Sequence, residues 1–593
     1  MKNIDTKKPG LPEKSPETDA WFTAFFIENH LDYYTYPDHV STPEQIRFIV
    51  FTQEDERYYP CSDHMFESIM NRNQSKFLQK KYHEILQKIL KLIDSQIENK
   101  KEKAYLESLI KIKYRHETRD EIMIPSRLEK RLLGIFLNRT QIEDPYICEK
   151  ALRNSRANKA LSSDALINAM NHGDIIDLKK PPSTLSGIRK ILHYLELERL
   201  LSLSVEHSLW ESDKAAGYTQ NDYLGLFNRG FSGNGVEPLF GFLGAQDKEK
   251  SLPKKILWLA DESGEIMVDL AIINYLANLG HKIIIAFKDG PFFTKVDYYD
   301  AVEDEMLSRQ LKGALFISEK NLGKNELANM LKSDKNIIVI SDGTRENLNL
   351  LLSPATFARI FKEVDGVISR GHDQRRRFFD THFQFTQNIY NISAGAKGSV
   401  LISFKPRHPA VIKFSHAGLE DKAKTIIDQM KEARKKGMTV IFYSGIIGSI
   451  PGKIEMAKKI MSVSINLLRE QFAMTFIINP SEYYETGMDA DDLMYMWEIV
   501  QTSGFIDIWR FQTYEDIVQT FQSMDKKVPP EWVGKDATFS TGCTKEMKIA
   551  LEVQQKYPEM QIIGPPQERF MRRQEYGIGK MYDQRLSQIC RQK

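Results

Sequence analysis

The chain has 593 residues, with 82 basic and 80 acidic side chains and a net charge of +2. Such a length suits two or three compact units, and the balanced charge excludes an overall field that would attract nucleic acid or an anionic membrane. No apolar run is long enough to span a membrane, and the four cysteines form no CxxC pair. We therefore expect a soluble cytoplasmic protein that binds neither nucleic acid nor membranes.

The N-terminal half is predicted to be helical. Residues 1–18 are polar and lack the apolar core of a secretory signal, so we interpret them as a mobile leader. From 19 to 250 the apolar residues recur mostly at helical spacing, which predicts a helical domain. We favour a bundle helix for residues 76–98, with a helix on a membrane or in a partner groove as the alternative. Its apolar stripe consists of Leu78, Tyr82, Ile85, Ile89, Leu92 and Ile97.

Residues 251–436 change to short β-rich runs that alternate with helical stretches. The alternation predicts βαβ crossovers, a mostly parallel sheet and hence an α/β fold. After Ser399 the segment VLISFKPRHPAVIKFS predicts two strands split by a proline-containing turn. Residues 437–593 continue the α/β pattern, as a third domain or as an extension of the same sheet. The clearest strands of the first series are ILWLAD, KIIIAFK, ALFIS, NIIVIS and GVISRG.

Charged turns follow three of these predicted strands. The carboxyl ends of parallel strands meet at one edge of a sheet, where open α/β folds keep their ligands. Carboxylates beside cations at such an edge are typical of a site for an anionic ligand, with or without a metal. The first turn is DESGE, from Asp261 to Glu265. The other two turns contribute Lys288, Lys295, Asp297, Asp300, Arg370, His372, Asp373, Gln374 and Arg375.

The acidic turn from Asp261 to Glu265 has two opposing interpretations. Carboxylate oxygens of Asp261 and Glu262 suit Mg²⁺ or Mn²⁺, and the helix that begins after Gly264 would accept a phosphate at its N-terminus. In the other interpretation, Glu262 and Glu265 only complement the helix dipole in its first turn.

These turns, in this order, resemble the damage-control phosphatase family, formerly a domain of unknown function and also described as acidic-residue methyltransferase-like. DESGEIMVD is similar to the family's Asp-Asn-(Ala or Ser)-Gly-Glu turn and the Asp that follows it. KDGPFFTKVDYYDA is similar to its Lys-x-Gly-Pro-x-x-Asn-Asp turn, and SRGHDQ to its Lys-Gly-x-x-Asn turn. In the helical half, DPYICEKALRNSRANKAL and HGDIIDL, residues 144–161 and 172–178, resemble two further family elements.

The resemblance implies a helical region packed on a Rossmann-like sheet with helices on both faces. It also implies metal-dependent hydrolysis of small phosphorylated metabolites such as sugar phosphates, with Mn²⁺ or Mg²⁺, or alternatively Co²⁺ or Ni²⁺. In the family the metal is held by the Asp and Asn of the first turn and by the Asp of the Asn-Asp pair. Only Asp261 matches that set, because Glu262 stands at the Asn, and Thr294 and Lys295 stand at the pair.

Two interpretations of the altered site remain open. If a metal is kept, the resemblance assigns Asp261, Glu262 and either Asp297 or Asp300 as ligands. If it is lost, Glu262 and Lys295 pair in its place and leave a catalytically inactive protein that binds a phosphometabolite. Carboxyl methyl transfer is a third reading, taken from family descriptions alone. The roles assigned to the remaining residues are catalysis for Asp261, Lys288 and Arg370, a leaving-group acid for His372, and substrate contact for Gly264, Glu265, Lys295, Gln374 and Arg375.

Overall fold

The structure is a computed structural model that describes residues 15–31, 48–50, 52, 56–71, 75–172, 184–244, 253–447, 449–450, 453–485 and 487–575. The HGDIIDL segment lies outside these ranges apart from His172, and so does the predicted leader up to residue 14. The chain divides into two compact units, Met1–Val411 and Ile412–Lys593. The helical segment and the first α/β segment belong to the same unit, and the predicted boundaries inside it stay predictions.

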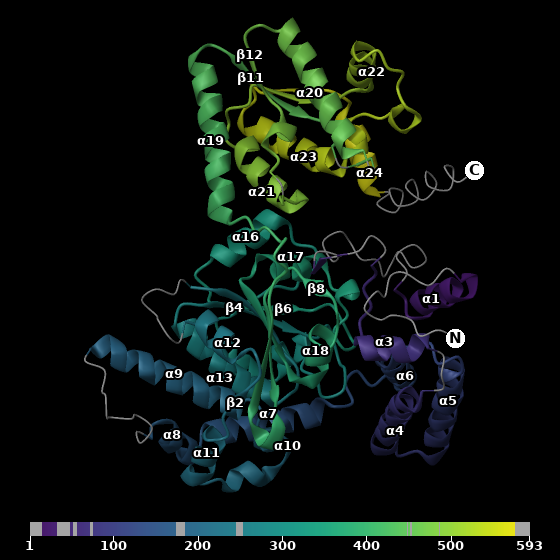
Figure 1. Ribbon diagram of the computed structural model, residues 1–593, viewed down its shortest axis with the longest axis vertical. Helices are drawn as coiled ribbons and strands as arrows, with labels where there is room; N and C mark the ends of the chain where they lie inside the picture. The colour runs from purple at the N-terminus through teal and green to yellow at the C-terminus, as the bar shows by residue number, and fades with distance from the viewer. Residues whose placement is uncertain are drawn as a thin grey trace. The chain divides into compact units, whose positions relative to one another are not determined.

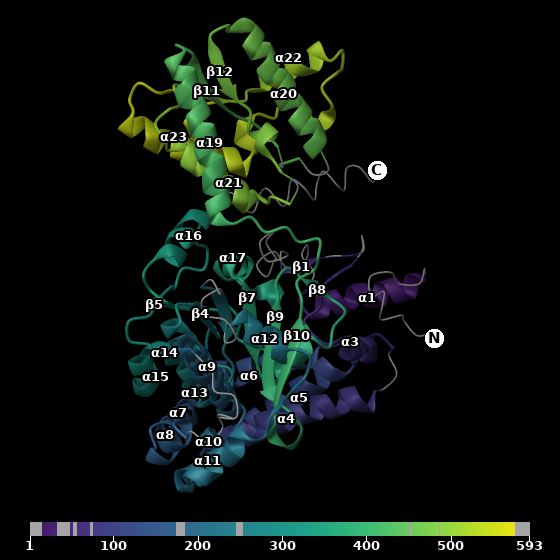
Figure 2. The ribbon, with the colours of Figure 1, turned by 60° about the vertical axis from the view of Figure 1, so that its left-hand side comes forward.

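The first unit is built on an eight-stranded sheet with the order β2-β10-β9-β7-β3-β4-β6-β5 (Figures 1 and 2). The six strands from β9 to β5 are parallel to one another, which confirms the predicted mostly parallel α/β fold. The strands are β2 (Phe231–Ser232), β3 (Lys255–Leu259), β4 (Lys282–Phe287), β5 (Leu315–Phe316), β6 (Ile337–Ser341), β7 (Gly366–Arg370), β9 (Ile389–Ala394) and β10 (Val400–Lys405). A short antiparallel pair, β1 (Ile49–Val50) and β8 (Gln384–Phe385), lies beside them.

The predicted hairpin after Ser399 is wrong in its second half. Strand β10 is antiparallel to β9, which precedes it, and residues 411–415 form no strand. Pro406 and Pro409 follow β10 directly, and proline offers no N–H to a sheet. The antiparallel partner therefore comes from the strand before the turn at residues 395–399.

Helices cover both faces of this sheet because the strands are apolar on both sides. Ile256 and Trp258 of β3 are buried against one face, and Leu257 and Leu259 against the other. The crossover helices after β3 to β7 are α13 (Glu265–Asn278), α14 (Tyr298–Glu303), α15 (Glu305–Gln310), α16 (Lys324–Lys332), α17 (Ala355–Glu363) and α18 (Gly371–Phe378).

The helical half supplies the outer layers. The apolar stripe of α4 is buried from Leu78 to Leu92 and packs against α5 and α6, so α4 is a bundle helix. None of the described helices combines the length and the apolar character that a membrane crossing requires. The helices of the helical half are α1 (Pro16–Glu28), α3 (Asp63–Met70), α4 (Lys76–Gln96), α5 (Lys100–Thr118), α6 (Pro125–Thr140), α7 (Ile147–Leu161), α8 (Asp164–Met170), α9 (Leu185–Leu203), α10 (Ser208–Glu211), α11 (Gln220–Phe227) and α12 (Val236–Phe242).

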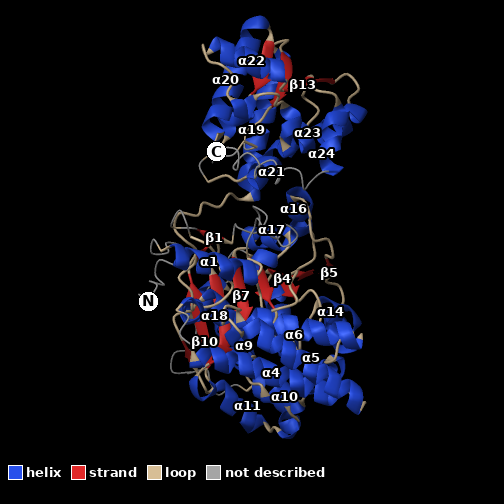
Figure 3. Cartoon of the chain, turned by 90° about the vertical axis from the view of Figure 1, so that its right-hand side faces the viewer, coloured by secondary structure: helices blue, strands red, loops and turns tan. Residues whose placement is uncertain are grey.

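The second unit has a parallel sheet of its own, of which Figure 3 labels β13. The strand order is β12-β11-β13-β14. The C-terminal α/β region is therefore not an extension of the first sheet. Its strands are β11 (Thr439–Ser444), β12 (Thr475–Ile478), β13 (Ile508–Phe511) and β14 (Gln561–Ile563). Its helices are α19 (His416–Lys435), α20 (Ile454–Gln471), α21 (Ala490–Gln501), α22 (Tyr514–Ser523), α23 (Thr541–Lys556) and α24 (Gln567–Glu575).

A carboxyl group is buried in this second unit. Glu546 of α23 accepts a hydrogen bond from Gln501 Nε2 at 3.0 Å, and among the described residues no cation forms an ion pair with it. Burial raises the pKa of Glu546 from 4.5 to about 7. The folded state therefore binds a proton between those pH values that the unfolded state has released, and stability contributed by this group falls as pH rises from about 4.5 to about 7.

We expect Glu546→Gln to remove this pH dependence, since glutamine keeps the size of the side chain and has no proton to lose. At pH 8 the variant should be more stable than the parent chain by on the order of 2 to 3 kcal/mol, and at pH 4.5 the two should be similar. Thermal unfolding followed by tryptophan fluorescence at both pH values measures the difference. An equal difference at pH 4.5 and pH 8 would contradict the burial argument.

Candidate active-site pocket

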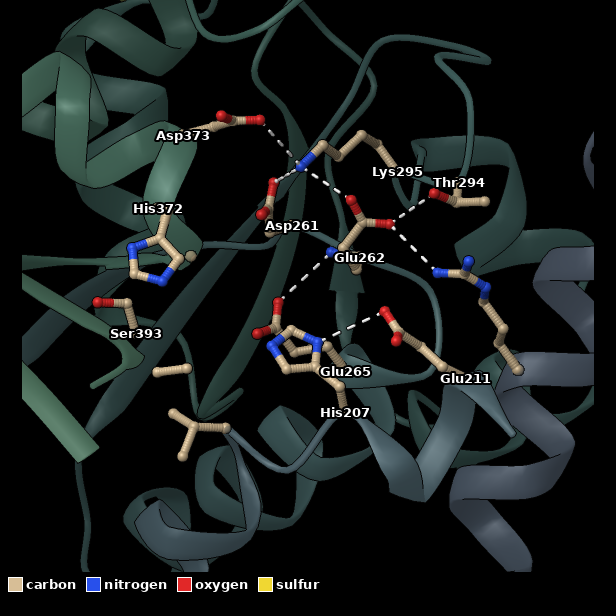
Figure 4. Close-up of a pocket in the computed structure, with 14 residues that line it drawn as sticks. His207, Glu211, Asp261, Glu262, Glu265, Thr294, Lys295, His372, Asp373 and Ser393 are labelled. Atoms are coloured by element: carbon tan, nitrogen blue, oxygen red, sulfur yellow. Dashed lines mark hydrogen bonds and ion pairs between the residues drawn. The ribbon is translucent and has the colours of Figure 1, made fainter. Parts of the chain in front are cut away.

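A pocket of about 300 Å³ opens at the carboxyl edge of the first sheet (Figure 4). The turn after β3, the loop after β4, the start of α18 and the end of β9 form its sheet side. Helices α7 and α10 of the helical half form the opposite side. The side chains with the clearest chemistry are Asp261, Glu262, Lys295, His372, Asp373 and Ser393.

Backbone hydrogen bonds join the turn after β3 to the loop after β4. Ser263 N–H donates to the carbonyl of Thr294 at 2.9 Å, and Val296 N–H donates to the carbonyl of Asp261 at 3.0 Å. Glu262 and Lys295 thus face one another as an antiparallel bridge. The backbone therefore sets the side chain of Lys295 beside the acidic turn.

The ammonium group of Lys295 lies where the carboxylates of the pocket converge. Its Nζ atom is 2.6 Å from Asp261 Oδ1, 2.9 Å from Glu262 Oε1 and 3.9 Å from Asp373 Oδ2. The other oxygen of Glu262 accepts a hydrogen bond from the Thr294 hydroxyl at 2.7 Å. Since a metal ion held by Asp261 and Glu262 would need the position of this ammonium, these residues as arranged do not fit a metal.

The ionisation of this cluster favours a charged lysine. Burial alone lowers the pKa of Lys295, but the carboxylates of Asp261 and Glu262 outweigh it and raise this pKa well above its ordinary value. Burial, with help from neighbouring carboxylates, raises the pKa of Asp261 to about 7 although Lys295 opposes the rise. Burial also raises the pKa of Glu265 to about 7, against the effect of Arg370. Near pH 7, Asp261 and Glu265 are therefore each only partly ionised.

Helix α7 is tied to the site by three polar side chains on one face. Lys150 contacts the loop after β4, Arg153 Nη1 lies 3.7 Å from Glu262 Oε2, and Asn154 Oδ1 accepts a hydrogen bond from Gly264 N–H at 2.7 Å. All three come from the DPYICEKALRNSRANKAL segment. Positions 153 and 154 lie three and four residues after position 150, and they therefore share its helix face. The segment therefore positions the pocket as well as lining it.

Three acidic residues outside the pocket lie close enough together to hold a metal ion, namely Asp144, Asp297 and Asp300. The Nζ atom of Lys150 stands among them, at 2.8 Å from Asp144, 2.9 Å from Asp297 and 2.8 Å from Asp300. Asp297 and Asp300, predicted as third ligands beside Asp261, do not line its pocket. Asp297 instead caps α14 by accepting from two backbone N–H groups.

Lys288 and Arg370, both predicted as catalytic residues, are buried behind the pocket and do not line it. Lys288 Nζ donates to Asp342 at 2.6 Å and to Thr344 Oγ1 at 3.2 Å. Arg370 has no exposed surface, and its guanidinium contacts Asp269 and Glu265 at 2.9 Å. Both side chains therefore connect the end of their own strand to a neighbouring segment of the fold.

Of the predicted substrate contacts, Glu265 and Lys295 line the pocket, as does His372. Gly264, Gln374 and Arg375 do not. Gln374 is buried, and its Oε1 atom has no hydrogen-bond partner within the described part of the chain. Arg375 contacts Asp380 at 3.3 Å. Gly264 has φ +80° and lies against Trp210, where a Cβ atom would stand 2.3 Å from the Cβ of Trp210.

Sequence reasoning assigned no role to several residues of the pocket. Arg153 belongs to the segment 144–161 that resembles the family. Its spacing from Lys150 could have indicated that it shares a helix face with Lys150 and Asn154. His207 and Glu211 of the α10 region and Ser393 at the end of β9 belong to no motif. Only the folded structure brings them to the strand ends.

The fold and the pocket define an α/β protein with a polar site at the carboxyl edge of its sheet. Residues 77–422, more than half of the chain, match the damage-control phosphatase ARMT1-like domain. The chain belongs to this family, which confirms the resemblance in the turns and supports a phosphatase-type role on damaged metabolites. No curated protein matches the chain. A solved structure of a DUF89 family protein from Pyrococcus horikoshii is 16% identical, with a TM-score of 0.38, and the match covers 54% of this chain and 96% of that one.

We expect Gly264→Ala to destabilise the first unit, because the new methyl group would overlap Trp210 and the backbone has positive φ. Gly280→Ala is the matched control: its φ is +94°, but the nearest atom to a new Cβ is 3.9 Å away. Urea denaturation should show a loss of free energy of unfolding about 1–3 kcal/mol larger for Gly264→Ala than for Gly280→Ala. Equal losses would show that Trp210 yields without cost.

Proposed function

We propose that this chain binds a small metabolite in the pocket without a resident metal ion, and that Lys295 supplies the positive charge in its place. The supporting observation is the buried ammonium at 2.6 Å from Asp261 and 2.9 Å from Glu262. Mg²⁺ binds its oxygen ligands at about 2.0–2.1 Å, so it would compete for the same point between these carboxylates.

The consequence for catalysis follows from the chemistry of the two cations. A divalent metal polarises a phosphoryl group and activates water, whereas a lysine ammonium is a point charge with three hydrogen-bond donors. Breaking a buried ion pair costs about 3–5 kcal/mol, which metal binding would have to offset before Lys295 could leave. We therefore propose recognition without metal-dependent hydrolysis, and keep hydrolysis of sugar phosphates with Mn²⁺ or Mg²⁺ as the alternative.

The ligand that we propose is a small phosphorylated metabolite, which is the class of ligand that family membership suggests. Arg153, Lys295 and His372 line the pocket and are the groups that would meet its phosphate. A cytoplasmic location belongs to the same proposal, and no observation favours carboxyl methyl transfer.

Restoring the ligand set that the resemblance implies should create a metal site. We expect the double variant Glu262→Asn with Lys295→Asp to bind Mn²⁺ with a Kd at least about tenfold lower than that of the parent chain, because the ammonium is replaced by an oxygen ligand. Isothermal titration with MnCl₂ measures the affinity, and release of phosphate from glucose 6-phosphate shows whether hydrolysis returns.

The control for this test is a charge change of the same kind at an exposed ion pair. Glu305 and Arg309 of α15 are 2.6 Å apart and largely exposed, so Glu305→Asn with Arg309→Asp should leave Mn²⁺ binding unchanged. Tight Mn²⁺ binding and phosphate release by the parent chain, both abolished by Asp261→Ala, would favour the hydrolase instead.

A further inference from the structure

One side of helix α5 is exposed and carries no acidic side chain. The helix packs against α4 and α6 at the outside of the helical half (Figure 1). Positions 101, 105, 108, 112, 115 and 119 follow one another at intervals of four and three residues, so they lie along one side of α5 and its C-cap. All six residues are exposed. This set, which we call the α5 face, consists of Lys101, Tyr105, Ser108, Ile112, Arg115 and Arg119.

The acids of α5 are turned away from this face or lie at its border. Glu117 is buried, and its carboxylate contacts Lys113 and Arg131. Glu107 contacts Lys111 at 3.0 Å on the flank of the helix. These two carboxylates are therefore compensated by cations outside the α5 face.

The α5 face keeps an excess of positive charge. At its border Glu102 follows Lys101 in the sequence, and Asp120 contacts Arg119 at 3.2 Å. Lys101 and Arg115 form no ion pair with any other residue that the structure describes. Residues 100–120 contain seven basic and four acidic side chains, whereas the whole chain has 82 and 80. The expectation that the chain binds no membrane rested on its overall charge, and the α5 face is a local exception.

Two large apolar side chains lie between these cations. Tyr105 is 57% exposed and Ile112 is 62% exposed. Exposed apolar residues that occur singly are ordinary, but these two are seven residues apart on one line of the helix. The exposed line of α4 is different, because it carries cations without a large apolar residue. That line consists of Lys76, Lys80, His83, Gln87 and Lys91.

We infer that the α5 face docks on an anionic membrane surface, with the helix lying parallel to it. The cations would meet the charged headgroups, and Tyr105 and Ile112 would enter the boundary between headgroups and acyl chains. The long side chain of Arg115 can reach the headgroups while its methylene groups stay at that boundary. This contact takes place at the surface and needs no spanning helix.

Another polyanion, a nucleic acid, fits the α5 face less well. Phosphates of a nucleic acid backbone would contact the cations, but they offer no apolar surface to Ile112. A membrane uses both kinds of side chain that the face presents. The inference is independent of the pocket and of the function proposed for it.

Co-sedimentation of the full chain with lipid vesicles tests this docking. Vesicles of phosphatidylcholine with about 30 mol% phosphatidylserine should bind the chain at least about tenfold more tightly than vesicles of phosphatidylcholine alone. About 0.5 M NaCl should release most of the bound chain. Equal binding to both kinds of vesicle, or no binding to either, would overturn the inference. Tighter binding to a DNA duplex than to the anionic vesicles would overturn it as well.

Variants on exposed positions show whether α5 makes the contact. Lys101→Glu with Arg115→Glu should weaken binding to the anionic vesicles at least about tenfold. Tyr105→Ser with Ile112→Ser should weaken it about three- to tenfold, since the apolar contribution is lost. Ile112→Trp should strengthen it and shift the tryptophan emission to shorter wavelength when vesicles are added.

The matched control makes the same charge change on the exposed line of α4. Lys76→Glu with Lys91→Glu should weaken vesicle binding less than about threefold, because these side chains would stay farther from the lipid surface. Equal losses from the α4 and α5 charge changes would show a diffuse electrostatic attraction and overturn docking by the α5 face. Unchanged binding after Tyr105 and Ile112 are both replaced by serine would overturn it too.

Discussion

The buried contact of Lys295 with Asp261 and Glu262 is the interaction on which the site depends. Its three groups come from the turn after β3 and the loop after β4, which the backbone joins. Removing one partner of a buried ion pair leaves an uncompensated charge and costs about 3–5 kcal/mol. Relative to the family pattern, Glu262 adds one negative charge and Lys295 replaces a negative charge with a positive one, so the two positions now carry opposite charges and form an ion pair.

A second lysine has a related position nearby. Lys150 stands among Asp144, Asp297 and Asp300 and ties α7 to the loop after β4. Both ammonium groups lie where carboxylates converge, and both join segments distant in sequence. They differ in what they can contact, because Lys295 lines the pocket and Lys150 does not. Lys150 thus stabilises the wall of the pocket, and Lys295 is available to a ligand.

The sequence predicts the fold better than the site. Alternating apolar runs are enough to place β3, β4, β6 and β7 in a parallel sheet, because both faces of those strands must be covered. Charged turns also locate the site at the strand ends. Sequence does not tell in which direction a side chain points, so Lys288 and Arg370 were expected in the pocket but are buried behind it. His207 and Ser393 follow no periodic pattern, and only tertiary packing brings them there.

The most direct test of the central claim is a crystal structure of the protein grown with excess MnCl₂, with anomalous scattering measured at the manganese edge. We predict that the Nζ atom of Lys295 lies between Asp261 and Glu262 and that no anomalous peak appears there. A manganese peak bound to both carboxylates, with Lys295 turned away, would contradict the account.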